Sequence, residues 1–166
     1  MVNYMLKIAA ELENLTNLQP QDGCDDPNFA YYFKVKCGNC GEVSQKETCV
    51  SLAETVPQPK SKGTVHLVQK CKFCGRDGTI LMISGRGRPL TYEVSQSGGE
   101  APLMLFDCRG FEPMGFIFDG GWKVESLEGT KFDGVDLSGG EYAEYDEKGN
   151  CPVMISNLRA TFHVDR

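Results

Sequence analysis

Two short cysteine pairs are the residues of this chain best suited to chemistry. Two residues separate Cys37 from Cys40, two separate Cys71 from Cys74, and a glycine follows each pair. This spacing lets the backbone turn so that both sulfurs of a pair point at one centre, about 2.3 Å away in a zinc–thiolate bond. Four thiolates complete the tetrahedral coordination of a structural zinc site. The sequence therefore predicts one Zn²⁺ per chain, with Cys37, Cys40, Cys71 and Cys74 as its ligands.

We call Cys37–Gly41 the first hook and Cys71–Gly75 the second hook. The glycine that ends each hook is expected to adopt a positive φ and to let backbone N–H groups approach the sulfurs. Thirty residues lie between the two pairs, more than the roughly 15–20 of a simple zinc ribbon. The intervening segment should therefore form additional structure. Rubredoxin-type iron uses the same paired cysteines, so the spacing does not separate zinc from iron.

Four further cysteines could supply a reactive thiol: Cys24, Cys49, Cys108 and Cys151. Cys49 and Cys108 are flanked by apolar residues, which predicts core positions. Cys24 precedes two aspartates, whose charges should raise the pKa of its thiol. Cys151 lies in a Gly-Asn-Cys-Pro loop before a strand pattern, and no histidine near it in sequence could activate it. None of the four is predicted to be catalytic.

The main alternative to a structural metal site is a thiol redox enzyme, with Cys37 and Cys40 as a redox dithiol or a lone cysteine acting as in methionine sulfoxide reductases. A reactive CxxC pair usually places its first thiol at a helix N-terminus, but residues 41–44 do not predict a helix. His66 and His163 both lie in strand patterns and are expected at the surface, with His66 near the second hook. We expect a non-catalytic protein, and the redox alternative stays open.

The charge balance argues against polyanionic partners. The formal net charge is −6 and the sequence pI is about 5.0, so the molecule as a whole repels phosphate backbones and anionic lipid surfaces. The lysines are scattered rather than gathered in tracts. No apolar stretch approaches the ~20 residues of a membrane span, and no signal peptide is recognisable. We expect a cytoplasmic protein whose thiols stay reduced, with no nucleic-acid or membrane partner.

The elements that would position the hooks are predicted to be strands, because 19 glycines and eight prolines punctuate short apolar runs. The N-terminal residues Leu6–Leu12 fit a strand or one face of a helix, and we favour a strand. Arg76–Gly78 carries an Asp-Gly turn signal before the next strand, which predicts a hairpin through the second hook. The other predicted strands are Tyr31–Cys37, which ends at the first hook, Val65–Lys70, which ends at the second, Thr79–Ile83, Leu103–Cys108, Gly115–Phe118, Trp122–Glu125 and Val153–Val164.

At 166 residues the chain suits a single domain, 1–166. A faint repeat aligns the segment before Cys37 with the segment before Cys108. It suggests two related β halves, 1–90 with the zinc knuckle and 91–166 without metal, in a barrel- or sandwich-like fold. Loops are expected at 56–63, 85–89, 96–102 and 139–140. The acidic stretch Glu141–Glu147 is expected to be solvated, or to contact a basic or metal-bearing partner.

Several separate motifs in this chain also resemble those of one family. They are Leu12–Leu18, Lys36–Glu42, Gln69–Cys74, Cys108–Pro113 and Tyr145–Lys148. Together they are similar to the eukaryotic CxxC-motif-containing zinc-binding proteins, long described as a domain of unknown function. The resemblance implies an all-β molecule of two related halves, with one zinc on the four hook cysteines. It implies no established activity.

From these observations we expect a monomeric interaction module with a structural zinc site. Its partner should be another protein, and the spare cysteines and acidic surface suggest a link to intracellular metal handling, for instance docking to a metallochaperone.

Overall fold

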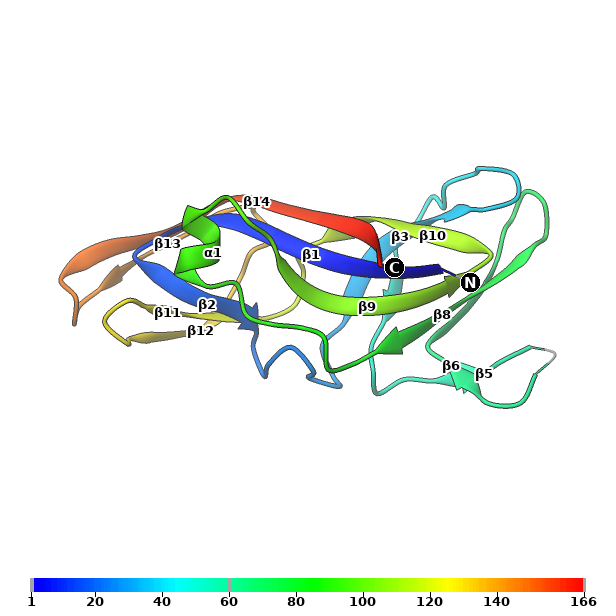
Figure 1. Cartoon of the computed structure of the whole chain (residues 1–166), viewed down its shortest axis with the longest axis horizontal. Helices are drawn as coiled ribbons and strands as arrows, with labels where there is room; N and C mark the ends of the chain where they lie inside the picture. The colour runs from blue at the N-terminus through cyan, green and yellow to red at the C-terminus, as the bar shows by residue number, and fades with distance from the viewer. Residues whose placement is uncertain (1, 60, 166) are drawn as a thin grey trace.

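The computed structural model describes residues 2–59 and 61–165, and it is mainly β, as predicted (Figure 1). Its one described helix is α1 (Tyr92–Gln96). The described strands are β1 (Val2–Glu13), β2 (Leu15–Pro20), β3 (Tyr31–Cys37), β4 (Thr48–Val50), β5 (Val56–Pro57), β6 (Thr64–Val65), β7 (Leu67–Lys70), β8 (Asp77–Ile83), β9 (Ala101–Arg109), β10 (Phe111–Ile117), β11 (Trp122–Ser126), β12 (Lys131–Val135), β13 (Tyr142–Asp146) and β14 (Cys151–Asp165).

A six-stranded antiparallel sheet forms the body of the molecule, in the order β13-β14-β1-β9-β8-β7. Two three-stranded sheets, β10-β3-β4 and β12-β11-β2, and the small hairpin β5-β6 complete the fold. Residues 1–90 supply β1, β7 and β8 to the large sheet, and residues 91–166 supply β9, β13 and β14. Figure 1 shows β11, β12 and β13 toward one end of the long axis and the two cysteine hooks at the other.

The ambiguous N-terminal segment is a strand. In β1 the side chains of Leu6, Ile8, Ala10 and Leu12 are all buried, as the alternating pattern predicts. β1 lies between β14 and β9 and pairs with both along most of its length, so its backbone groups are used on both sides. A central position in the sheet explains why the strand pattern prevails over the helical one.

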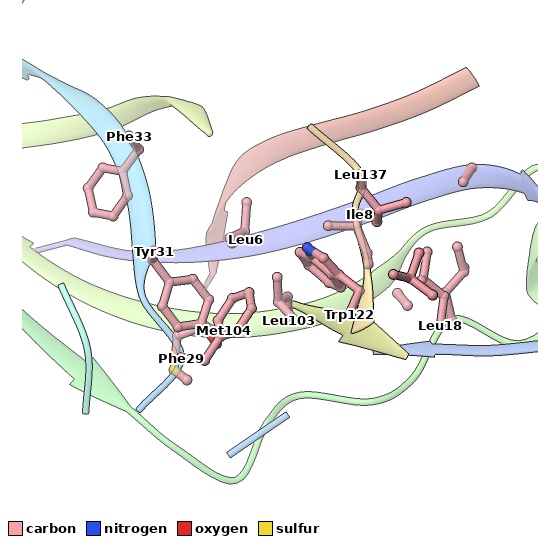
Figure 2. Close-up of a cluster of buried hydrophobic side chains, with 14 of the residues drawn as sticks. Leu6, Ile8, Leu18, Phe29, Tyr31, Phe33, Leu103, Met104, Trp122 and Leu137 are labelled. Atoms are coloured by element: carbon pink, nitrogen blue, oxygen red, sulfur yellow. The ribbon is translucent and has the colours of Figure 1, made fainter. Parts of the chain in front are cut away.

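Aromatic side chains fill the core on which β3 lies (Figure 2). Tyr31 and Phe33 of β3 are fully buried and meet Phe106 of β9 with ring centroids 5.8 and 5.3 Å apart. Each fully buried aromatic of this kind contributes about 1.5–3 kcal/mol through removal of its apolar surface from water. Because β3 ends at Cys37, this packing fixes the position of the first hook.

Several parts of the fold differ from the sequence predictions. The helix α1 was not predicted. It is only five residues long, and the Thr91 hydroxyl caps it by accepting the Val94 N–H at 3.3 Å. Strands β2, β4, β12 and β13 were also missed, since they are short or carry no clear apolar alternation, and the two-residue strand β5 lies in the loop expected at 56–63. The strand predicted at Gly115–Phe118 is β10 and begins earlier, at Phe111.

The hairpin predicted through the second hook is confirmed, since β7 and β8 pair on either side of it. Asp77 and Gly78 do not form its turn, because Gly78 lies within β8, opposite Gln69 of β7. The glycine at this position is explained by tertiary packing, because a Cβ at Gly78 would lie 2.6 Å from ring atoms of Phe111. This glycine therefore serves close packing of β10 against β8 rather than a turn.

Candidate metal centre

The two hooks have nearly the same backbone geometry. In the first, the Gly41 N–H donates to the Cys37 carbonyl at 3.0 Å, and the Cys37 N–H donates to the Glu42 carbonyl at 2.9 Å. In the second, Gly75 donates to Cys71 and Cys71 donates to Arg76, both at 2.9 Å. The closing glycines have φ values of +78° and +77°. The predicted positive φ is confirmed, and it is the conformation that only glycine adopts without strain.

The hooks bring four sulfurs to one point. The Cys37 and Cys74 sulfurs are 3.6 Å apart, as are those of Cys40 and Cys71, and all four lie within 4.8 Å of one another. A disulfide needs about 2.05 Å, whereas sulfurs on a tetrahedral zinc with ~2.3 Å bonds are separated by about 3.8 Å. All eight cysteines are free thiols. The four cysteines lie close enough to coordinate one zinc ion.

Hydrogen-bond donors surround two of the sulfurs and favour their thiolate forms. The N–H groups of Cys40 and Asn39 lower the pKa of the Cys37 thiol, and the Asn39 N–H lies 3.4 Å from that sulfur. The Asn39 side chain reaches across to the second hook. Together with the Arg76 N–H, it lowers the pKa of Cys74 to about 6. Because zinc binds thiolates, these donors prepare the cluster for a cation.

Cys40 has the opposite tendency. The Glu42 N–H acts to lower the pKa of Cys40, but desolvation of its sulfur and the three neighbouring cysteines together raise it to about 12. Four sulfurs this close cannot all carry an unscreened negative charge. A bound dication removes this repulsion, and its binding releases the remaining protons.

The turn between β9 and β10 connects both hooks and was missed by sequence reasoning. The Gly110 carbonyl accepts the Gly38 N–H of the first hook at 2.9 Å. Gly110 has φ +87°, and a Cβ there would lie 2.7 Å from the Asp77 carbonyl oxygen, just beyond the second hook. Phe111 follows and is paired with Cys37. In the sequence this turn lies within the motif Cys108–Pro113, which does not by itself reveal the contact.

The other four cysteines do not belong to the four-sulfur cluster. Cys108 is buried, as predicted, and burial raises the pKa of its thiol to about 12. Burial is also the main reason why the pKa of Cys24 is raised, with Asp25 second. The core position predicted for Cys49 was wrong, because Cys49 is exposed on the sheet-edge strand β4. Cys151 is the first residue of β14 rather than part of a loop, and it is half-buried.

The two histidines do not join the hooks among the described contacts. His66 lies at a bend between β6 and β7, where its Nδ1 accepts the Met82 N–H at 2.9 Å. Its imidazole also bonds the Leu52 backbone, and burial lowers its pKa. His163 is on β14, and its Nε2 lies 3.2 Å from a carboxylate oxygen of Glu100.

One member of the acidic stretch is not solvated, contrary to prediction. Asp146 has no exposed surface. Its Oδ1 accepts the Thr130 hydroxyl at 2.6 Å and the Lys148 N–H at 3.1 Å, and these bonds, Thr130 first, lower its pKa. Asp146 therefore closes the β13–β14 turn, while Glu141, Glu144 and Glu147 are exposed.

The mainly β fold and the compact four-cysteine centre place this chain in the class of small zinc-binding proteins. Comparisons with known proteins support the same class. The family model of the CXXC motif containing zinc binding protein, eukaryotic, matches residues 5–163. Proteins of that name from Xenopus laevis and Homo sapiens are 36% and 35% identical to the chain, over 98% and 95% of both sequences. The chain belongs to this family.

Solved structures show the same fold. The crystal structure of C1orf123 superposes with a TM-score of 0.86 at 34% identity, covering 98% of this chain and 99% of that one. A hypothetical protein from Plasmodium falciparum has a TM-score of 0.81 at 22% identity and shows the fold alone. Within residues 2–59 and 61–165, no helix has the length and apolar character to span a membrane.

Proposed function

We propose that this protein is a cytoplasmic, monomeric interaction module in which zinc is structural and no reaction is catalysed. The observation that carries the proposal is the four-sulfur cluster itself. Four thiolates fill the coordination sphere of zinc, which leaves no position for a water or a substrate. A catalytic zinc would need an open position, so the donor set favours a role in holding the fold together.

The location of the cluster supports the same proposal. The hooks extend from β3 and from the β7–β8 hairpin, which belong to different sheets. A metal ion that bonds both hooks ties these sheets together at an end of the molecule. Zinc bound to such a site supplies folding free energy directly.

The test is zinc content and thermal stability in matched cysteine variants. Cys71→Ser removes one ligand, and Cys49→Ser removes an exposed thiol outside the cluster. We expect the first variant to lose most of its zinc and to unfold at lower temperature, while the control behaves as the wild type. A Cys71→Ser protein with unchanged zinc and unchanged melting temperature would contradict a structural role.

We further propose that the partner is a protein of intracellular metal handling, such as a metallochaperone, and that neither nucleic acid nor membrane is bound. The exposed carboxylates of Glu141, Glu144 and Glu147 support this, since they attract a basic surface such as a metal-carrying partner can present. The measurement is binding of purified metallochaperone domains to the zinc-loaded chain. Failure of all of them to bind would refute this partner class.

A thiol redox enzyme is the second function to consider, because the pKa of Cys74 is lowered to about 6 and both Cys40 and Cys74 are exposed. Two features count against it. The two sulfur contacts of 3.6 Å join different hooks rather than the two cysteines of one CxxC pair, and neither hook begins a helix. Turnover in an insulin-reduction or methionine sulfoxide assay would favour the enzyme.

A further inference from the structure

A groove lies beside the metal centre, and Cys37 and Cys71 are among the residues that line it. Its cavity volume is about 430 Å³. One wall is the segment 42–49 that follows the first hook, and the other is the end of β7 with the second hook. The first wall is anchored to β3, because the Ser44 N–H donates to the Val35 carbonyl at 2.9 Å.

The groove offers apolar contacts to a ligand. Val35, Val43, Phe73 and Phe111 contribute to its lining. Phe73 lies between the two cysteines of the second hook, and 75% of its surface is exposed, by far the largest value among the exposed large apolar side chains. An exposed aromatic at the rim of an apolar groove is typical of an anchor in protein recognition.

The charge of the groove opposes that of the whole molecule. Four cationic side chains line it, against two acidic ones, Glu42 and Glu47, in a chain of net charge −6. The four are Lys46, Lys70, Lys72 and Arg76, and all are exposed. Among the ion pairs of the described residues, none involves these four. Their charge is therefore available to an acidic ligand.

A free sheet edge adjoins the groove at Lys70, one of its lining residues. β7 is the last strand of the six-stranded sheet, bonded to β8 on one side only. The Cys71 N–H points at β8, since it donates to the Arg76 carbonyl. Antiparallel pairing alternates, so the N–H and C=O groups of Val68 and Lys70 point the other way, toward the open edge. Such an edge accepts an added strand.

We propose that this groove binds an acidic, extended peptide segment of a partner protein. The segment adds to the free edge of β7, its carboxylates meet the lysines and Arg76, and an apolar side chain packs against Phe73 and Phe111. This inference rests on the proposed function as an interaction module and assigns a second binding surface, separate from Glu141–Glu147, with the chemistry of the segment that it binds. Zinc then has a second effect, because it fixes the hook that carries Phe73.

A polyanion fits the groove less well. Nucleic-acid affinity comes from several phosphate contacts, and the net negative charge outside the groove repels a long charged backbone. A short peptide makes only local contacts with the cations, and it alone uses the strand edge.

The experiment selects random linear heptapeptides displayed on phage against the zinc-loaded full chain. Three proteins are compared: wild type, Lys46→Glu/Lys70→Glu, and the control Lys131→Glu/Lys148→Glu, whose exposed lysines lie away from the groove. We expect peptides that alternate acidic and apolar residues. A synthetic version of a selected peptide should bind the wild type and the control equally well. It should bind the Lys46→Glu/Lys70→Glu protein, called the groove variant, about tenfold more weakly. Hydrogen exchange should show protection of the Val68 and Lys70 amides.

Other results overturn the inference. Peptides that bind the groove variant equally well place the binding surface elsewhere and leave the interaction module intact. If anionic vesicles or single-stranded DNA bind the wild type as tightly as the peptide does, and this binding is lost in the groove variant, the ligand is a polyanion. If sedimentation shows that the wild type forms oligomers and the groove variant does not, the occupant of the groove is a second copy of this chain. If the selection on the zinc-loaded chain enriches no peptide, the groove is not a peptide-binding site. The proposed function is tested separately by the zinc content of the wild type, and a wild-type protein that binds no zinc would refute it.

Discussion

Replacement of Gly110 by alanine tests how the β9–β10 turn holds the two hooks together. The added methyl group would lie 2.7 Å from the Asp77 carbonyl oxygen and 3.0 Å from the Gly78 Cα, both rigid backbone atoms. Such overpacking costs about 1–3 kcal/mol. The positive φ of +87° adds about 1–2 kcal/mol, because a Cβ in the left-handed region crowds the following carbonyl. The expected loss in unfolding free energy is therefore about 2–5 kcal/mol.

The chain supplies a matched control for the backbone term. Gly129 has φ +93°, but a Cβ there meets nothing within 4 Å. Gly129→Ala should lose only the left-handed term, so the difference between the two variants measures the contact itself, about 1–3 kcal/mol.

The assay is urea unfolding at a fixed excess of free zinc, which holds the contribution of metal binding constant. Zinc affinity is measured beside it by competition with a chelator. Gly110→Ala should also weaken zinc binding, since its carbonyl accepts the Gly38 N–H of the first hook, and Gly129→Ala should not. Equal stability losses in the two variants, with equal zinc affinity, would refute the reasoning.

Two further predictions concern polar contacts. Asn39→Ala should lower zinc affinity about 10–100-fold in a chelator competition, because its side chain bonds Cys74 from the opposite hook; affinity within twofold of the wild type would contradict this. The pKa of His66 is lowered in the folded state, so the unfolded chain binds the proton first and stability should fall as pH drops below about 6.5, the unfolded value. His66→Asn keeps an acceptor for the Met82 N–H without titrating, and its stability in urea melts should depend less on pH across that window; an unchanged slope would exclude His66 as the cause.

The metal ligands could be predicted from the sequence because their geometry is local. Two residues between cysteines and a glycine after them define each hook without reference to the rest of the fold, and the strand patterns ending at Cys37 and at Lys70 deliver them. The same holds for β1, whose apolar alternation matches its buried face.

What the sequence did not reveal depends on contacts between distant residues. Gly78 reads as a turn residue but is a packing site for Phe111, and Gly110 supports both hooks through backbone contacts that leave no pattern. Cys49 reads as a core residue but lies exposed, since β4 is a sheet edge. Asp146 reads as solvated but is buried against Thr130.

The most direct test of the central claim is zinc K-edge X-ray absorption on protein purified without oxygen. A structural site on Cys37, Cys40, Cys71 and Cys74 predicts one zinc per chain with a single shell of four sulfurs at about 2.3 Å. A shell that contains nitrogen or oxygen at about 2.0–2.1 Å would mean an open or different site. Absence of zinc, with Cys37 joined to Cys40 in a disulfide, would contradict the account and favour thiol redox chemistry.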